Sequence, residues 1–284
     1  MKATGQRHTL SAADGVDLAL YTYGSKEAER AAIVLHGIES HAGWFTASCE
    51  ALARAGLRVV CLDRRGSGTS GGKRGHAASS AVLLDDLGRV VSWIHAEQPD
   101  RPLQAVAHSW GAVYALAYLG RSPAAFERLS LVSPGLFPLV DLRPSRKVAV
   151  ALGAVIAPGL TLPIPIGGPE AFTANPARRE AIGSDEARLQ HATNRFFACV
   201  WRLRRMALAA VHRTEAPLTI FLAGHDAIID TDATRRFFYR LGEGVLVETF
   251  ETAHHTLEFE PDPAAFLEAL VRWCGAPPGR EALL

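Results

Sequence analysis

Short runs of apolar residues recur along the chain, and most are followed by a polar or glycine-containing turn and then by residues with helical periodicity. A continuous apolar run of this length is typical of a strand that is buried on both faces. The runs that we interpret as strands are residues 31–35, 57–62, 103–107, 129–132, 218–223 and 245–250. They indicate a sheet that is covered by helices on both sides.

Helical patterns separate these strands. The predicted helices cover residues 44–55, 112–119, 232–241 and 263–273, together with a longer helix that begins at Ser79 or Ser80 and ends before Pro99. A repeated alternation of strand and helix predicts an α/β fold with a mostly parallel, doubly wound sheet. Residues 9–13 and 16–23 flank Asp14-Gly15, a dipeptide that favours a tight turn, so we expect an antiparallel hairpin at the start of this sheet.

The alternation stops between residues 136 and 212. This segment contains no convincing buried strand, and prolines and glycines interrupt its apolar part at residues 148–168. A membrane-spanning helix needs about twenty apolar residues without such breaks, so we do not expect one here. A helix is expected at residues 185–210. We therefore predict a core formed by residues 1–135 and 213–284, with residues 136–212 inserted as a mainly helical cap.

Composition narrows the possible functions. The chain has 284 residues, of which 48% are apolar and 21% charged, and its formal net charge is +1. This balance gives no reason to expect a nucleic acid as a partner. The cysteines and histidines show no metal-ligand spacing, so we expect no metal site. The N-terminus lacks the apolar stretch of a signal peptide, which predicts a cytoplasmic protein.

The strand at residues 103–107 leads into Ser109, which stands between Ala107 and Gly111 and is followed at once by a helical pattern. A serine at such a sharp turn is held with its hydroxyl exposed, and the close approach of strand and helix requires small neighbours. Ser70 matches the Gly-x-Ser-x-Gly pattern more strictly, but no strand precedes it and no helix follows it. Ser109 is therefore the candidate nucleophile.

A serine nucleophile needs a basic histidine that is oriented by a carboxylate. Asp226 and, four residues later, Asp230 follow the strand at residues 218–223, and His254 and His255 follow the strand at residues 245–250. The carboxyl ends of parallel strands meet at one edge of a sheet, where ligands bind. The chain order Ser, Asp, His is the order found in α/β-hydrolases.

Five stretches together resemble an α/β-hydrolase, and within that fold the group of monoacylglycerol lipases and lysophospholipases that also contains the serine aminopeptidases. They are His36-Gly-Ile, Asp63-Arg-Arg-Gly-Ser-Gly-Thr-Ser-Gly, Ala107-His-Ser-Trp-Gly, Gly224-His-Asp-Ala-Ile-Ile-Asp and Ala253-His-His-Thr-Leu. Ala107 departs from the glycine that is more frequent there in the family, but alanine is still small.

The resemblance implies roles for single residues. It favours Asp226 over Asp230 as the acid and His255 over His254 as the base. The backbone N–H of Trp110, which follows the nucleophile, and by resemblance that of Ile38 would bind the oxyanion, while His36 would shape the loop through hydrogen bonds. No cofactor is implied.

The strongly apolar cap favours a small-molecule ester with an apolar acyl group, and hence a serine carboxylester hydrolase. An aminopeptidase or amidase with the same three residues is the alternative; it would need a carboxylate of the cap near Ser109. The candidates are Glu170, Glu180, Asp185 and Glu186. A ligand-binding member of the fold with little catalytic activity is a further alternative.

Overall fold

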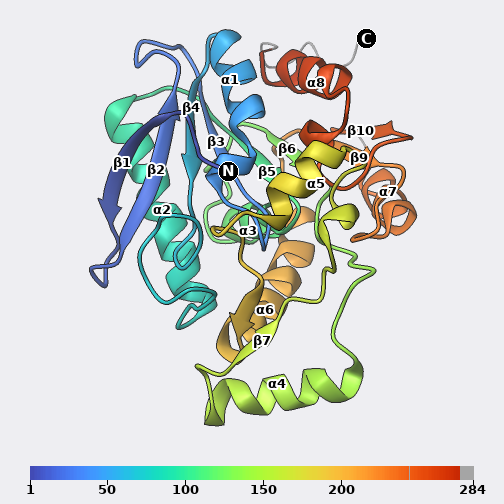
Figure 1. The fold of residues 1–284 in the computed structure, drawn as a ribbon. Coiled ribbons are helices and arrows are strands. Elements are labelled where there is room, and N and C mark those ends of the chain that lie inside the picture. The colour runs from blue at the N-terminus through green and yellow to red at the C-terminus, as the bar shows by residue number, and fades with distance from the viewer. Residues whose placement is uncertain (243, 276–284) are drawn as a thin grey trace.

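The computed structural model describes residues 1–242 and 244–275, and in these residues one large sheet forms the centre of the protein (Figure 1). Its eight strands lie in the spatial order β1 (Gln6–Ser11), β2 (Asp17–Tyr23), β4 (Arg58–Leu62), β3 (Ala31–Leu35), β5 (Leu103–His108), β6 (Leu129–Val132), β9 (Leu218–Ala223) and β10 (Val245–Phe250). The strands β4 to β10 of this order are parallel, and β1 and β2 are antiparallel. The predicted α/β class and the hairpin at Asp14-Gly15 are confirmed.

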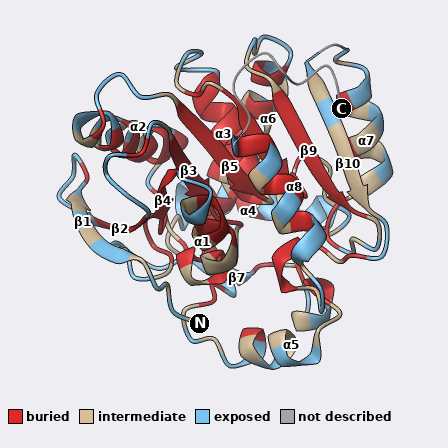
Figure 2. Cartoon of the chain, turned by 90° about the horizontal axis from the view of Figure 1, so that it is seen from above, coloured by how far each residue is buried: buried red, intermediate tan, exposed pale blue. Residues whose placement is uncertain are grey.

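Helices cover both faces of the sheet, as the buried strands require. α1 (Thr46–Arg54) packs against α8 (Ala264–Gly275), and α2 (Ser80–Glu97) packs against α3 (Trp110–Leu119). The remaining helix of the core, α7 (Thr231–Tyr239), contacts β9 and β10. Figure 2 shows that the inner strands and α3 are buried, whereas the edge strand β1 is partly to fully exposed and the edge strand β10 is mainly of intermediate burial. Of the two serines considered at the start of α2, Ser79 caps the helix, because its hydroxyl accepts a hydrogen bond from Val82 N.

The inserted segment 136–212 contains helices and one small hairpin. Its elements are α4 (Pro144–Ile156), β7 (Thr161–Pro163), the 3-10 helix η2 (Pro169–Ala171), α5 (Pro176–Gly183), β8 (His191–Thr193) and α6 (Asn194–Val211). The long helix begins at Asn194 and not at residue 185 as expected. Residues 191–193 instead pair with β7, and the hydroxyl of Thr193 caps α6 by accepting a hydrogen bond from Phe196 N.

Within the inserted segment, α6 packs along α3 of the core, while α4 packs on α6 and lies farthest from the sheet (Figure 1). The outer side of α4 and the turn after it carry large apolar side chains that are exposed. They are Val148, Leu152, Val155, Ile156 and Leu160. Among the residues that the structure describes, no helix is both long and apolar enough to cross a membrane.

Gly111 shows how closely α3 approaches the sheet. A Cβ atom added at this position would lie 2.3 Å from the Leu35 carbonyl oxygen and 2.8 Å from that of His36. Both are backbone atoms of β3 and its end, so they cannot move aside without displacing the strand. The spacing of small residues around Ser109 thus has a steric cause.

We predict that Gly111→Ala lowers the free energy of unfolding by about 1–3 kcal/mol or more, because the added methyl overpacks a buried contact. Urea denaturation measures this change. Gly183→Ala is the control, since the nearest atom to its Cβ position is Pro169 Cγ at 3.8 Å. A Gly111→Ala protein as stable as Gly183→Ala would contradict the steric account.

Candidate active site

Ser109 lies between β5 and α3 with a strained backbone, φ 54° and ψ −118°. A positive φ is uncommon for a residue with a side chain. Three backbone hydrogen bonds hold this conformation. Ser109 N donates to Val132 O at 2.8 Å, and Ser109 O accepts from Gly135 N at 3.0 Å and from Ala112 N at 3.1 Å. The side chain lies half-buried at the carboxyl edge of the sheet, next to an empty space.

Ser70 has a different environment. Its hydroxyl accepts a hydrogen bond from Ala19 N at 2.8 Å and donates one to Asp63 O at 2.5 Å. Both partners are backbone atoms, so this side chain ties the loop after β4 to strand β2. Ser70 lines neither of the cavities that border Ser109.

Asp226 and His255 come together from the ends of β9 and β10. His255 Nδ1 lies 2.8 Å from Asp226 Oδ2, and both side chains are almost fully buried. The other carboxylate oxygen accepts hydrogen bonds from Ile228 N at 2.8 Å and Ile229 N at 3.0 Å. Because the carboxylate accepts a hydrogen bond from the Nδ1–H group, the lone pair of the imidazole is placed on Nε2, the atom that a general base needs free.

The two alternative residues have other partners. Asp230 caps α7 by accepting a hydrogen bond from Ala233 N at 2.8 Å. His254 Nδ1 lies 3.4 Å from Glu260 Oε2, and its ring stands edge-on to that of His225. Neither Asp230 nor His254 lines a cavity at Ser109.

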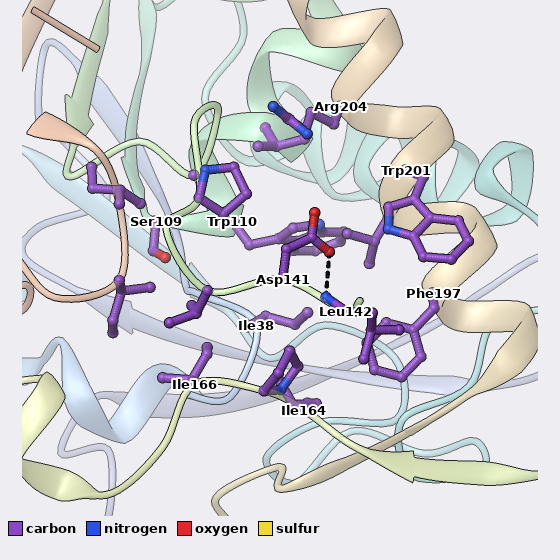
Figure 3. Close-up of a pocket in the computed structure, with 18 residues that line it drawn as sticks. Ile38, Ser109, Trp110, Asp141, Leu142, Ile164, Ile166, Phe197, Trp201 and Arg204 are labelled. Atoms are coloured by element: carbon purple, nitrogen blue, oxygen red, sulfur yellow. Dashed lines mark hydrogen bonds between the residues drawn. The ribbon is translucent and has the colours of Figure 1, made fainter. Parts of the chain in front are cut away.

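Two cavities border Ser109. The larger cavity comprises about 730 Å³ of empty space, part of it open to solvent. It lies between the turn at Ser109 and the inserted segment (Figure 3). Its wall is mostly apolar and includes Ile38, Trp110, Val113, Val140, Leu142, Ile164, Ile166, Phe197, Val200, Trp201, Ile228 and Ile229. Figure 3 shows Phe197 and Trp201 projecting from α6 opposite Ser109.

The smaller cavity is lined by both Ser109 and His255, so the candidate nucleophile and the candidate base border the same space. Gly37 also borders it. A Cβ atom added there would lie 3.3 Å from Ser109 Cβ and 3.6 Å from Ser109 Oγ. The absence of a side chain at Gly37 therefore leaves room beside the candidate nucleophile.

The candidate oxyanion donors lie close to Ser109, with Ile38 in the loop after β3 and Trp110 at the start of α3. Ile38 and Trp110 line the same cavity as Ser109, and neither backbone N–H donates to an acceptor in the described part of the chain. His36 supports this loop. Arg64 N donates to His36 Nε2 at 3.0 Å, so Nδ1 carries the proton and donates to Gly37 O at 2.8 Å. Burial holds the pKa of His36 well below its usual range, which keeps the ring neutral.

A buried ion pair joins this loop to the inserted segment. Arg188 Nε lies 2.8 Å from Glu39 Oε2, and the backbone N–H of Leu189 donates to Glu39 O at 2.8 Å. Burial raises the pKa of Glu39 to about 7, against the lowering effect of Arg188. Nearby, Asp185 Oδ2 lies 2.9 Å from His41 Nε2 and accepts a hydrogen bond from Trp44 Nε1.

Sequence reasoning did not single out Glu39, Arg188 or Asp141. Asp141 lines the larger cavity, where it accepts a hydrogen bond from Leu142 N and pairs with Lys147 Nζ at 2.5 Å. Glu39 could have been noticed in the sequence, because it is a charged residue only two positions after Gly37 at the end of a predicted strand. No comparable signal marks Arg188, because its partner is far away in the sequence.

Comparison with known proteins shows the family to which the chain belongs. The family model described as serine aminopeptidase, S33, matches residues 26–262. The chain belongs to this family. A monoacylglycerol lipase of Mycolicibacterium smegmatis is 24% identical to it over 279 residues, which cover 96% of this chain and 98% of that protein.

Solved structures show the same fold. The monoacylglycerol lipase of Paleococcus ferrophilus has a TM-score of 0.82 at 22% identity, covering 91% of this chain and 98% of its own. A soluble variant of monoglyceride lipase from Saccharomyces cerevisiae has a TM-score of 0.79 at 17% identity, covering 96% and 95%. The expected resemblance to the α/β-hydrolases of the monoacylglycerol lipase group is confirmed, and the chain is a serine hydrolase.

His108, next to Ser109, gives the protein a pH-dependent stability. Its ring stacks on Phe45 at a centroid distance of 4.0 Å, and burial, with a smaller effect of His255, lowers its pKa to about 3. An unfolded histidine has a pKa of about 6.5. Below that pH the histidine of the unfolded chain takes up a proton that folded His108 does not. The contribution of neutral His108 to the free energy of unfolding is therefore fully present above pH 6.5 and is lost as the pH is lowered.

On going from pH 8 to pH 5, we predict that the free energy of unfolding falls by about 2 kcal/mol less in His108→Phe than in the wild type. Urea denaturation at both pH values measures this difference. Phenylalanine keeps the stacking on Phe45 but has no proton to bind. His95→Phe on the exposed side of α2 is the control and should leave the pH dependence unchanged, since water reaches that ring in both states. Equal pH dependence in wild type and His108→Phe would contradict the prediction.

Proposed function

We propose that this protein is a serine carboxylester hydrolase in which Ser109 is the nucleophile, His255 the general base and Asp226 the residue that orients it. The observation that carries the proposal is the hydrogen bond between Asp226 and His255 at the cavity that His255 shares with the strained Ser109. A serine hydroxyl is a weak nucleophile by itself and requires such a base. The side chains of Asp226 and His255 are almost fully buried, which strengthens the hydrogen bond between them.

In the first half of the reaction, Ser109 Oγ attacks the ester carbonyl carbon and its proton passes to His255 Nε2. The carbonyl oxygen becomes an oxyanion, which the N–H groups of Ile38 and Trp110 bind. The tetrahedral intermediate then collapses. The ester C–O bond breaks, and His255 returns the proton to the departing alcohol, which leaves an acyl-enzyme.

In the second half, water attacks the acyl carbon and gives a proton to His255. A second oxyanion forms at the same N–H groups. Its collapse breaks the bond to Ser109 Oγ, which recovers its proton from His255 as the carboxylic acid is released. Atoms and charges balance with water as the only co-reactant, so the chemistry requires no cofactor.

The larger cavity supports an apolar acyl group as the substrate feature that is recognised. Its wall is lined mainly by aliphatic and aromatic side chains, as is usual for small-molecule sites. The exposed apolar side chains of α4 add a surface that a lipophilic ester can contact on approach. We therefore propose a lipophilic ester such as a monoacylglycerol, a lysophospholipid or an aryl ester.

The alternative of an aminopeptidase finds less support. Among the expected carboxylates of the cap, Glu170, Glu180 and Glu186 are exposed and Asp185 is bound to His41 and Trp44, and none lines a cavity at Ser109. Two other carboxylates, Asp141 and Glu39, do face these cavities. Both are already paired with cations, Lys147 and Arg188, so neither is free to bind a substrate ammonium group.

We predict that Ser109→Ala abolishes both hydrolysis of a chromogenic ester and labelling by a fluorophosphonate, because the reacting oxygen is removed. Asp226→Asn should lower kcat by about 10⁴-fold, as expected when the base loses its orienting carboxylate. Mass spectrometry of the labelled protein identifies the modified serine.

Ser70→Ala and Asp230→Asn are the matched controls. The first removes the competing serine and the second the competing acid, and neither side chain faces the cavities. Both variants should retain labelling at Ser109 per folded molecule. Full ester hydrolysis by Ser109→Ala, or loss of labelling in Ser70→Ala alone, would refute the assignment.

We predict further that kcat/KM rises with acyl chain length from acetate to medium-chain esters by up to about fourfold per methylene, the gain from burying one CH2 group. Val200→Phe, which narrows the larger cavity, should shift the optimum to shorter chains. Val148→Phe on the exposed side of α4 should not. A flat or falling profile in the wild type, or higher activity on aminoacyl anilides than on esters, would contradict an apolar acyl site.

A further inference from the structure

Arg64 is a buried cation beside the candidate oxyanion hole. It follows β4, its residue is only 2% exposed, and its guanidinium donates from Nη1 to Gly37 O at 3.1 Å and from Nη2 to Ile38 O at 2.9 Å. The ion pairs of the described residues include those of Arg58 and Arg65 but none of Arg64. Burying a charge without a counter-ion is costly, so its position requires a reason.

The hydrogen bonds of Arg64 determine where the Ile38 N–H points. In a trans peptide the carbonyl of one residue and the N–H of the next point in opposite directions. Arg64 and His36 Nδ1 both donate to Gly37 O and hold this carbonyl on their side of the loop. The N–H of Ile38, in the same peptide plane, is therefore directed to the opposite side.

Arg64 also contacts the second candidate donor residue. Its guanidinium carbon lies 4.8 Å from the ring centroid of Trp110 and 5.3 Å from that of Phe196, which belongs to α6 of the inserted segment. Burial lowers the pKa of Arg64 to about 10, so the group stays protonated at neutral pH. A positive charge with no carboxylate partner thus lies next to both residues that would bind the oxyanion.

We propose that Arg64 is a positioning residue of the oxyanion hole. It orients the Ile38 N–H through the Gly37 and Ile38 carbonyls, and its positive charge, which forms no ion pair among the described residues, favours the negative charge that develops on the substrate oxygen. This inference rests on the proposed function and assigns a role to a residue that contacts neither the nucleophile nor the base. Removing a donor of an oxyanion hole costs 10²- to 10³-fold in kcat, and His36 still holds Gly37 O when Arg64 is replaced. A smaller loss is therefore expected.

The test compares Arg64→Met and Arg64→Lys with the wild type on a chromogenic ester, per folded molecule as judged by circular dichroism. For Arg64→Met we expect kcat to fall about 10- to 100-fold while KM changes less than about threefold. Arg64→Lys keeps the charge and should recover part of this loss. Affinity for an alkyl trifluoromethyl ketone, which forms an anionic tetrahedral adduct with the serine, should weaken in parallel with kcat/KM.

Arg128→Met is the matched control. Arg128 is also buried, donates to a backbone carbonyl, that of Trp273, and lies over a tryptophan ring, but it precedes β6 at the opposite edge of the sheet. Its replacement should lower stability without changing kcat per folded molecule. If Arg64→Met does not fold, Arg64→Lys alone tests the proposal. For this variant we expect kcat to fall about 3- to 10-fold while KM again changes less than about threefold.

An unchanged kcat, a loss carried by KM, or an equal kcat loss in Arg128→Met would overturn the role of Arg64. So would unaltered binding of the trifluoromethyl ketone. Failure of the proposed function is detected separately, because Ser109→Ala would then retain activity. Inactive Ser109→Ala together with fully active Arg64 variants would refute the inference and leave the proposed function intact.

Discussion

The strained turn at Ser109 is the constraint on which the rest of the site depends. Its φ of 54° carries a cost on the order of 1–3 kcal/mol, and the hydrogen bonds with Val132 and Gly135 offset this cost. These partners exist only because β6 lies beside β5 in the sheet. The close contact of Gly111 with β3 fixes the turn from the other side. The position of the serine is thus a property of three neighbouring strands and not of one loop.

The parallel register of the sheet brings the other groups to the same edge. Leu35 of β3 lies opposite Ala107 of β5, and Phe250 of β10 lies opposite Ala223 of β9. The residues that follow each of these positions are consequently neighbours in space. Hydrogen bonds then select among them: Asp226 reaches His255, whereas Asp230 is occupied by the N-terminus of α7.

The inserted segment completes the site with two kinds of interaction. Apolar side chains of α6 and of residues 164–166 form the wall of the larger cavity, while polar contacts of Arg188 and Asp185 attach this segment to the loop after β3. In the proposed function, the apolar wall selects substrates with an apolar acyl group. The buried polar contacts keep the loop that carries Ile38 in one place, since an unpaired Glu39 or Arg188 in this interior would be costly.

The sequence alone determined the order of strands and helices in the core, because short-range periodicity and turn residues report local structure directly. It did not predict α4, α5 or the hairpin of β7 and β8 in the inserted segment. The sequence also singled out Ser109 and, at the strand ends that meet in a parallel sheet, two candidate acids and two candidate bases. The family resemblance favoured Asp226 and His255 among them. Its prediction of a helix from residue 185 was wrong, because residues 185–193 form contacts with distant segments that periodicity does not encode. The pairing of Glu39 with Arg188, the unpaired charge of Arg64 and the shape of the apolar cavity were decided by the tertiary structure, since each depends on side chains far apart in the chain.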